Sequence, residues 1–434
     1  MELVSGGGAV GVGGAVNAAG SDVEGQAGSR TVALGGGVAQ GGGVAQGGSV
    51  AQGGAPTAGA GHTGGAPHPV TPPPNPCIAA GTCPAGQWVN VTPAGINLDP
   101  NFSCAGCNYG AQEVVADPVR RGDLYAFFCY QGVWKSEDYG LTWKKVSTGT
   151  NAAHLEAGRP WAAAIDPNPR RDSNTPPALY TVAGYGDLLG VYKSINGGVD
   201  WTRYDVNNTQ GVPSNDVYAI DIDPLDSNHL IAGFHDVGLS ESKNGGMTWS
   251  TIPVPAKFGR SVFPWFVLNS PSPSTTWLTM AQWESNVNGM WRTEDSGKTW
   301  TQVLPTLEHG HGSSQIFQDG KGAIYAAGAG QNGVIFRSAD FGKTWAAAKS
   351  NMIPQDQVFG TASYIYATLP AANTGESQHL QRSPISDGVN WSDWAPTAPQ
   401  GMTNGAKRAA VTYDGTHYIV VTGNWLAGLW RYIE

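Results

Sequence analysis

Histidines gather in loop segments that we predict to lie on one side of the molecule. Two of the nine histidines fall in an N-terminal low-complexity stretch, and four of the other seven lie at positions 154, 235, 309 and 311. Imidazole changes its protonation near neutral pH and is therefore suited to proton transfer. The candidate catalytic residues are His154, His235, His309 and, as a proton donor, Tyr185.

Arginines and tryptophans occur in the same segments. A guanidinium group binds carboxylates through paired hydrogen bonds, and aromatic rings suit the apolar faces of sugars. This combination indicates a site for an anionic carbohydrate, such as a uronate-containing glycan. The candidate substrate-binding residues are Arg159, Arg260, His311, Trp283, Trp425 and Arg408.

Two reactions are compatible with such a site. In an elimination, Arg159 or Arg260 would neutralise the uronate carboxylate and a histidine would take the neighbouring C–H proton, while a second histidine or Tyr185 would protonate the leaving oxygen. A hydrolysis would instead need two carboxyl groups about 5–9.5 Å apart. Elimination is the favoured hypothesis. The carboxylates in the same segments are Asp187, Asp216, Asp236, Glu284 and Glu308.

Simpler interpretations of the same residues stay open. A single histidine or arginine in a loop is most often a solvated or hydrogen-bonded residue. His309 and His311 could also hold zinc or copper together with His154 or His235. We nevertheless predict no resident metal and no cofactor. A calcium ion in the fold stays possible, although the sequence contains no diagnostic carboxylate loop.

An internal repeat defines the elements that must position these residues. The pattern is Ser-x-Asp-x-Gly-x-Thr-Trp, and consecutive tryptophans are 45 to 58 residues apart. Asp or Asn can bond its own backbone, glycine supplies a positive φ, and Thr-Trp leads into a strand, so each copy predicts a hairpin turn. Five good copies and a degenerate sixth span 136–143, 194–201, 242–249, 293–300, 338–345 and 383–391.

This pattern resembles the Asp-box, or BNR, repeat of β-propellers. The resemblance implies four-stranded blades in which the box turns are structural, with binding residues at the opposite mouth. Sialidases, xyloglucan-degrading glycosidases, sortilin-type receptors and a photosystem assembly factor share the repeat. Gly158-Arg159-Pro160 is not the Arg-Ile-Pro motif of sialidases. Xyloglucanases pair two propellers where this chain has one, and a sortilin-type receptor would add a cysteine-rich module and a membrane span. Some lyases of glucuronate-bearing glycans share only the architecture.

The fold class that follows is an all-β, single seven-bladed propeller over 77–434. The last blade stops after a third strand at 428–432, and the segment 87–91 resembles a fourth strand, so we expect the N-terminal strand to complete that blade and close the ring. Six or eight blades are the alternatives. First strands are expected near Val114, Ala162, Tyr218, Phe266, Gln315, Tyr364 and Ala410.

The segment 1–76 is predicted to be a disordered Gly/Ala/Pro-rich tether, because it contains no Phe, Trp or Tyr. All five cysteines follow it. The close pairs Cys77/Cys83 and Cys104/Cys107 favour disulfides, although Cys-x-x-Cys also occurs in zinc and redox motifs, and Cys129 lies in an apolar run. Disulfides and a tether favour an extracellular or surface-tethered protein. The start Met1–Val4 lacks the features of a signal peptide.

Composition excludes some partners. Across 434 residues the net charge is −9, which argues against nucleic acid, and no apolar run is long enough to span a membrane. We expect a monomer whose partner is a polysaccharide or glycan. The favoured function is an exported carbohydrate-active propeller acting on an acidic polysaccharide. A non-catalytic propeller that binds glycan or protein is the main alternative, and an intracellular assembly or scaffold role is a further one.

Overall fold

The computed structural model describes sixteen ranges of the chain. The described residues are 30–32, 74–104, 107–168, 171–184, 189–204, 217–234, 238–255, 261–282, 289–305, 316–327, 335–347, 357–368, 380–394, 401–402, 408–424 and 426–434. Strand residues 30–32, 183–184, 261–262, 281–282 and 408 are described by their backbone alone.

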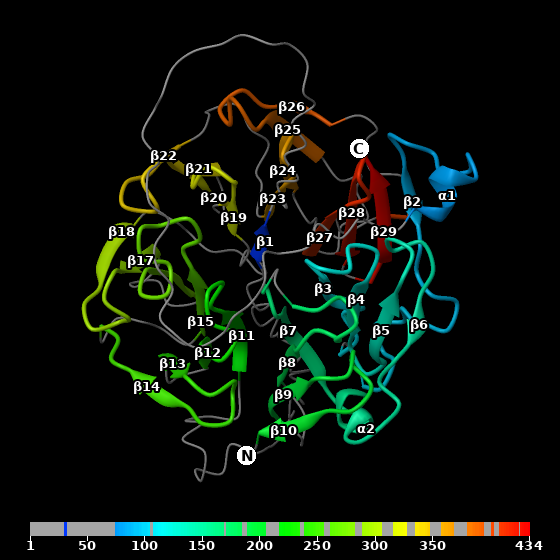
Figure 1. Cartoon of the computed structure of the whole chain (residues 1–434), viewed down its shortest axis with the longest axis horizontal. Coiled ribbons are helices and arrows are strands. Elements are labelled where there is room, and N and C mark those ends of the chain that lie inside the picture. Colours follow the sequence, from blue (N-terminus) through cyan, green and yellow to red (C-terminus); the bar gives the residue numbers. More distant parts are fainter. Residues whose placement is uncertain are drawn as a thin grey trace, which may run out of the picture.

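The described residues form seven sheets arranged in a ring, which confirms the predicted seven-bladed propeller (Figure 1). Blade one contains β3 (Ala111–Ala116), β4 (Leu124–Phe128), β5 (Gly132–Ser136) and β6 (Lys144–Lys145). Blade two contains β7 (Arg159–Ile165), β8 (Leu179–Gly184), β9 (Gly190–Ser194) and β10 (Thr202–Tyr204). Blade three contains β11 (Val217–Ile222), β12 (Leu230–Phe234), β13 (Gly238–Ser242) and β14 (Ser250–Ile252).

The remaining blades repeat this antiparallel order from the centre outward. Blade four contains β15 (Ser261–Phe266), β16 (Trp277–Gln282), β17 (Gly289–Thr293) and β18 (Thr301–Leu304). Blade five contains β19 (Ile316–Gln318), β20 (Ile324–Ala327), β21 (Ile335–Ser338) and β22 (Ala346–Ala347). Blade six contains β23 (Gln357–Gly360), β24 (Tyr364–Thr368), β25 (Leu380–Pro384) and β26 (Ser392–Asp393). Blade seven contains β27 (Arg408–Tyr413), β28 (Tyr418–Asn424), β29 (Gly428–Ile433) and β2 (Trp88–Asn90).

The expected first strands agree with the structure except in blade six. Tyr364 begins β24, the second strand, and the first strand of that blade is β23. The first strand, Gln357–Gly360, contains only two apolar side chains besides glycine, so the sequence predicts a strand there less clearly than over Tyr364–Thr368. The described residues also form two short helices, α1 (Pro76–Ala79) and α2 (Ala152–Leu155). No helix among the described residues is long and apolar enough to cross a membrane.

The ring closes as predicted, because β2 pairs with β29. Trp88 lies opposite Tyr432 in this antiparallel pair, and Asn90 lies opposite Trp430. An N-terminal strand thus supplies the outermost strand of the C-terminal blade. Pairing the two ends of the chain in one sheet leaves no open seam in the ring.

The box turns lie between third and fourth strands and are held by bonds within the turn. In blade one, Gly140 donates its backbone N–H to Ser136 Oγ at 2.8 Å, and Thr142 donates to Asp138 Oδ1 at 2.8 Å. The indole N–H of Trp143 donates to the carbonyl of Gly140 at 3.1 Å. The equivalent bonds recur in blades four and five, which supports the structural role predicted for the boxes.

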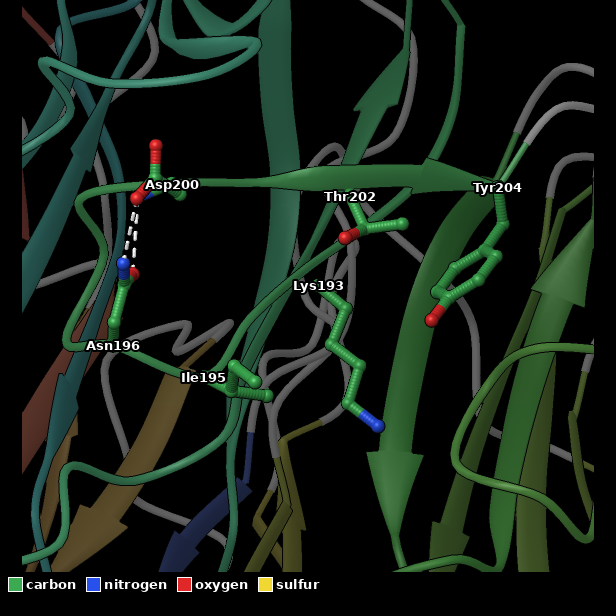
Figure 2. A pocket seen from close by; sticks show the side chains of 6 residues that line it. All are labelled: Lys193, Ile195, Asn196, Asp200, Thr202 and Tyr204. Carbon is green, nitrogen blue, oxygen red and sulfur yellow. Dashed lines mark hydrogen bonds between the residues drawn. The ribbon is translucent and has the colours of Figure 1, made fainter.

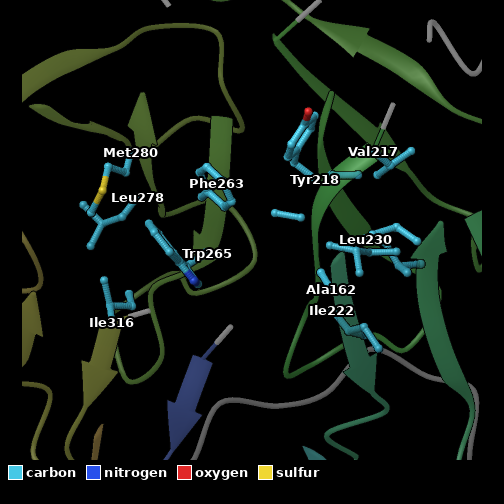
Figure 3. Close-up of a cluster of buried hydrophobic side chains, with 14 of the residues drawn as sticks. Ala162, Val217, Tyr218, Ile222, Leu230, Phe263, Trp265, Leu278, Met280 and Ile316 are labelled. Atoms are coloured by element: carbon cyan, nitrogen blue, oxygen red, sulfur yellow. The ribbon is translucent and has the colours of Figure 1, made fainter. Parts of the chain in front are cut away.

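A basic residue on the third strand ties several blades to the next box turn. Lys193 donates to the carbonyl of Gly245 at 2.9 Å, and Arg292 Nε donates to the carbonyl of Phe341 at 2.8 Å. Apolar side chains fill the space between the sheets, as Figure 3 shows for blades two to five. Neighbouring blades are therefore joined by both packing and polar contacts.

The cysteines lie as the short spacings suggested. Cys77 and Cys83 form a disulfide with Cα atoms 5.0 Å apart, and Cys104 and Cys107 form another with Cα atoms 5.3 Å apart. Cys129 is a buried free thiol. Burial raises the pKa of Cys129 to about 12, so the thiol stays protonated at neutral pH.

A short strand from the N-terminal segment lies beside the innermost strand of blade five. This strand, β1 (Arg30–Val32), pairs in parallel with β19, with Arg30 opposite Ile316 and Val32 opposite Gln318. Figure 1 places it near the centre of the ring. The remainder of the predicted tether up to residue 73 lies outside the described residues, so the boundary at residue 76 stays a prediction.

Candidate functional site

Strand direction defines a mouth at the edge opposite the boxes. First strands begin there, and second strands turn there into third strands. In blade one, Cys129 donates its backbone N–H to the carbonyl of Gly110 at 3.0 Å, and Tyr130 donates to that of Gly158 at 3.0 Å. The turn after β4 therefore holds the starts of both β3 and β7.

β-Bulges interrupt the first strands of blades one, two and three at this mouth. The register shifts between Ala111 and Glu113, between Pro160 and Ala162, and between Val217 and Ala219. The extra residues are Gln112, Trp161 and Tyr218. A bulge redirects a side chain and is common next to binding sites. In β15 of blade four the register is continuous.

Arg159 lies in an aromatic cluster that joins blades one and two. Its guanidinium carbon is 4.7 Å from the ring centroid of Tyr109 and 5.8 Å from that of Trp161. Trp161 in turn stacks on Tyr218 with centroids 5.9 Å apart. Cation–π contact of this kind holds a guanidinium in one orientation. Arg159, predicted to bind substrate, therefore occupies a defined position at the mouth, where 9% of its surface stays exposed.

Gln112 and Glu113 are mouth residues that the sequence analysis did not identify. Gln112 Nε2 donates to the carbonyl of Tyr109 at 3.2 Å, and Glu113 Oε1 accepts the backbone N–H of Val114 at 3.2 Å. Both side chains are buried. The signal for them is two adjacent polar residues inside an apolar strand, which is unusual for a strand that is buried along its length.

His154 occupies a different place from Arg159. It lies in α2, which Figure 1 shows on the outer side of the ring, whereas β7 lies toward the centre. Its ring packs edge-on against Tyr192 of β9, with centroids 6.2 Å apart. Among the described residues its Nδ1 atom has no hydrogen-bond partner. The short helix thus directs His154 to the third strand of blade two.

Most other predicted site residues are outside the described residues. Arg408 begins β27 and pairs with Gly423, but its side chain is not described. No group of three or more potential metal ligands occurs among the described residues. The residues outside the description are Tyr185, His235, Arg260, Trp283, His309, His311 and Trp425, together with the carboxylates Asp187, Asp216, Asp236, Glu284 and Glu308.

A pocket lies on the outer part of blade two. This pocket has a volume of about 430 Å³ and is formed by the hairpin of β9 and β10 and by the box turn between them (Figure 2). It is separate from the mouth, because the box turns lie at the opposite edge of each blade. Its lining residues are Lys193, Ile195, Asn196, Asp200, Thr202 and Tyr204.

Comparison with known proteins agrees with this architecture. The family model for the BNR-Asp box repeat matches residues 335–347, the box turn of blade five with its flanking strands. The structure of the GH74 xyloglucanase from Xanthomonas campestris is similar, with a TM-score of 0.54 and 21% identity over 80% of this chain and 53% of that one. The structure of YCF48 from Cyanidioschyzon merolae is similar over 98% of its own length, with a TM-score of 0.50 and 13% identity over 80% of this chain. The chain is an Asp-box β-propeller.

Two curated proteins show sequence similarity. The xyloglucanase of Hypocrea jecorina (strain QM6a) is 25% identical over 252 residues, which cover 55% of this chain and 25% of that enzyme. The xyloglucanase of Paenibacillus sp is 22% identical over 306 residues, which cover 64% of this chain and 29% of that enzyme. The matches thus span only about a quarter of the length of these relatives.

Proposed function

We propose that this chain is a carbohydrate-active propeller that binds a polysaccharide at the mouth formed by blades one to three. The observation that carries the proposal is the orientation of Arg159 by Tyr109 and Trp161 at that mouth. A fixed guanidinium offers paired donors to sugar or carboxylate oxygens, and a tyrosine ring offers a surface for the apolar face of a sugar. Similarity to two xyloglucanases supports a glycan as the ligand.

Hydrolysis is the reaction that the relatives favour. A xyloglucanase is a hydrolase, so the similarity does not support the elimination and the acidic substrate that the sequence alone favoured. We propose that the two carboxyl groups that a hydrolase needs are among Asp187, Asp216, Asp236, Glu284 and Glu308. Glu113 is a further carboxylate close to the mouth, although it is fully buried.

Elimination on a uronate stays as a second candidate because of Arg159. A guanidinium in this position is suited to neutralise a uronate carboxylate, which acidifies the neighbouring C–H. The proton acceptors in this candidate, His235 and His309, are outside the described residues, and their place at the mouth stays a prediction. The position of His154 against Tyr192 on the outer side of the ring makes it a weaker candidate for this role.

The proposed setting is outside the cell. Two disulfides among the described residues are typical of exported proteins, and the relatives act on xyloglucan by name. A net charge of −9 fits a protein that binds no nucleic acid. We further propose that the chain is a monomer.

One assay on the purified full chain separates these possibilities. Xyloglucan, other neutral glucans and uronate-bearing polysaccharides are incubated with the protein, and both reducing ends and the ultraviolet absorbance of an unsaturated uronate are followed. Reducing ends without absorbance support a hydrolase, and both signals together support a lyase. Retardation in polysaccharide-containing gels without either signal supports a non-catalytic binding propeller. A chain with none of these signals would refute the proposed function.

Arg159→Ala tests the site within that assay. We expect it to abolish or strongly reduce binding and any activity. Arg382→Ala is the matched control. Arg382 also stacks on a tyrosine, since its guanidinium carbon is 4.2 Å from the ring centroid of Tyr364, but both residues lie in blade six. Equal behaviour of the two variants would move the site away from the mouth of blades one to three.

A further inference from the structure

The pocket on blade two is formed by one face of a hairpin. Lys193 lies directly opposite Thr202 in the pairing of β9 with β10, and Tyr204 lies opposite Val191. Residues two apart on a strand point to the same face. Lys193 on one strand therefore shares a face with Thr202 and Tyr204 on the other, and Ile195 of the adjoining box turn lines the same pocket (Figure 2).

The repeats within this chain show which pocket residues are special to blade two. The position after the box serine holds Glu137, Lys243, Glu294 and Ala339 in other blades, but Ile195 in blade two. Ile195 is 71% exposed, at a position that is polar or small in the other four good repeats, and it supplies apolar surface to the pocket.

Tyr204 is equally exceptional. The third position after the box tryptophan holds Val146, Ile252, Val303 and Ala348 in other blades, so Tyr204 is the one aromatic residue at this position in the five good repeats. Its ring is half-buried at the side of the pocket. Burial raises the pKa of its hydroxyl, which therefore stays protonated and able to donate at neutral pH.

The polar groups of the pocket are held in place before any ligand arrives. Asn196 Nδ2 donates to Asp200 Oδ2 at 2.8 Å, and Asp200 Oδ1 accepts the backbone N–H of Thr150 at 2.6 Å. Lys193 Nζ donates to the carbonyl of Gly245 at 2.9 Å and lies 5.1 Å from the ring centroid of Tyr180. The pocket thus presents one fixed cation and one fixed carboxylate, whose charges cancel.

We propose that this pocket is a second glycan-binding site, in which a neutral sugar ring lies against Tyr204 and Ile195. An apolar and aromatic floor bounded by paired donors and acceptors matches a pyranose ring, which has an apolar face and hydroxyl groups around its edge. A volume of about 430 Å³ lies within the range of small-molecule sites. Cancelling charges favour a neutral ligand over an anionic one. This inference rests on the proposed function and extends it to a separate surface.

The test is affinity electrophoresis of the full chain in gels containing soluble xyloglucan. Tyr204→Ala should weaken the apparent affinity about three- to tenfold, in line with the loss of one aromatic contact. Val303→Ala, at the same repeat position in blade four, is the matched control and should leave retardation unchanged. Ile195→Glu keeps the fold intact, because Glu137 and Glu294 occupy the same position in two other boxes, and it should also weaken binding.

The outcomes separate the two proposals. Loss of affinity in both Tyr204→Ala and Ile195→Glu, with Arg159→Ala acting in addition, supports two separate sites. Unchanged retardation in both pocket variants, with a loss in Arg159→Ala, overturns the second site and leaves the proposed function standing. A wild-type chain that xyloglucan does not retard overturns the second site, and it overturns the proposed function as well only if the chain also releases no reducing ends and no unsaturated uronate.

Discussion

The imidazole of His229 lies 2.7 Å from the carboxylate of Asp223, with Nδ1 facing Oδ2. Its other nitrogen, Nε2, lies 2.8 Å from Glu241 Oε1, so one ring bridges two carboxylates of blade three. The ring also packs against Phe266 and Trp277 of blade four, at centroid distances of 5.1 and 6.1 Å. This contact joins two blades near the edge that carries the boxes.

The His229 bridge predicts a dependence of stability on pH. Burial opposes the charged ring, but the hydrogen bonds to Asp223 and Glu241 outweigh it and raise the pKa of His229 from 6.5 to about 9. Because the pKa of His229 is higher in the folded chain, the protonated ring stabilises the folded state. This stabilisation is complete below the pKa of 6.5 that the ring has in the unfolded chain, and it is lost as the pH rises through about 9. The shift corresponds to about 3 kcal/mol at most.

Thermal melts of the wild type and of His229→Gln from pH 6 to 10 check this prediction. The variant should melt at a lower temperature near pH 6, and the difference should shrink as the pH passes about 9. A difference that is constant over this range would mean that the ring acts through packing alone.

The contact of Arg431 in blade seven with blade one predicts that the junction between these two blades depends on one buried cation. Its Nε donates to the carbonyl of Tyr139 in blade one at 2.7 Å, and its Nη2 donates to Asn75 Oδ1 at 3.3 Å. Burial lowers the pKa of this guanidinium to about 10, which still leaves it charged at neutral pH. Arg431→Met should cost about 2–3 kcal/mol, because hydrogen bonds to a buried charged group are lost.

Urea unfolding measures that cost, and limited proteolysis locates it. Arg292→Met removes the equivalent contact between blades four and five and is the matched comparison. We expect cleavage near residues 75–90 in the Arg431 variant alone. Identical cleavage patterns in the two variants would show that the seam is no weaker than other blade junctions.

The first box turn has room only for glycine at position 140. The φ of Gly140 is +79°, and a Cβ atom there would lie 2.5 Å from Cγ2 of Val421 in blade seven. Gly140→Ala should therefore cost more than the 1–2 kcal/mol or so of a left-handed conformation alone. Gly81→Ala is the control, since Gly81 has a φ of +66° and open space around it. Similar melting temperatures for the two variants would contradict the steric argument.

The ring of Tyr109 is expected to hold Arg159 in its orientation. Tyr109→Phe keeps the ring under the guanidinium and should preserve glycan retardation, whereas Tyr109→Ala should weaken it by about 0.5–1 kcal/mol or more. The measurement is affinity electrophoresis of both variants beside Arg159→Ala. If Tyr109→Ala binds like the wild type, the cluster does not orient Arg159 for a ligand.

Removal of the predicted tether tests whether the propeller is independent of it. A chain that begins at residue 74 keeps Asn75 and both disulfides. We expect this shortened chain to melt at the same temperature as the full chain. A clear decrease would show that the pairing of β1 with β19, or another part of the first 73 residues, contributes to the folded state.

Local interactions explain why the architecture could be predicted from the sequence. The bonds of a box turn connect residues two to four apart, such as Ser194 with Gly198, so the turn is encoded wherever the pattern occurs. Repetition then fixes the strand order, and the resemblance of 87–91 to a fourth strand predicts its pairing with β29. Tyr364 shows the limit, because the longer apolar stretch Tyr364–Thr368 follows only three residues after the first strand, Gln357–Gly360, and is the stronger strand pattern of the two.

Contacts between side chains of different blades could not be predicted from the sequence, because they depend on the tertiary structure. Arg159 meets Tyr109 across 50 residues of sequence, and the bulge at Gln112 exists only in the pairing of β3 with β4. His154 and Arg159 are five residues apart, yet α2 turns the histidine to Tyr192 on the outer side of the ring. Residue types and turns are local properties of the chain, whereas the meeting of side chains depends on how the sheets pack.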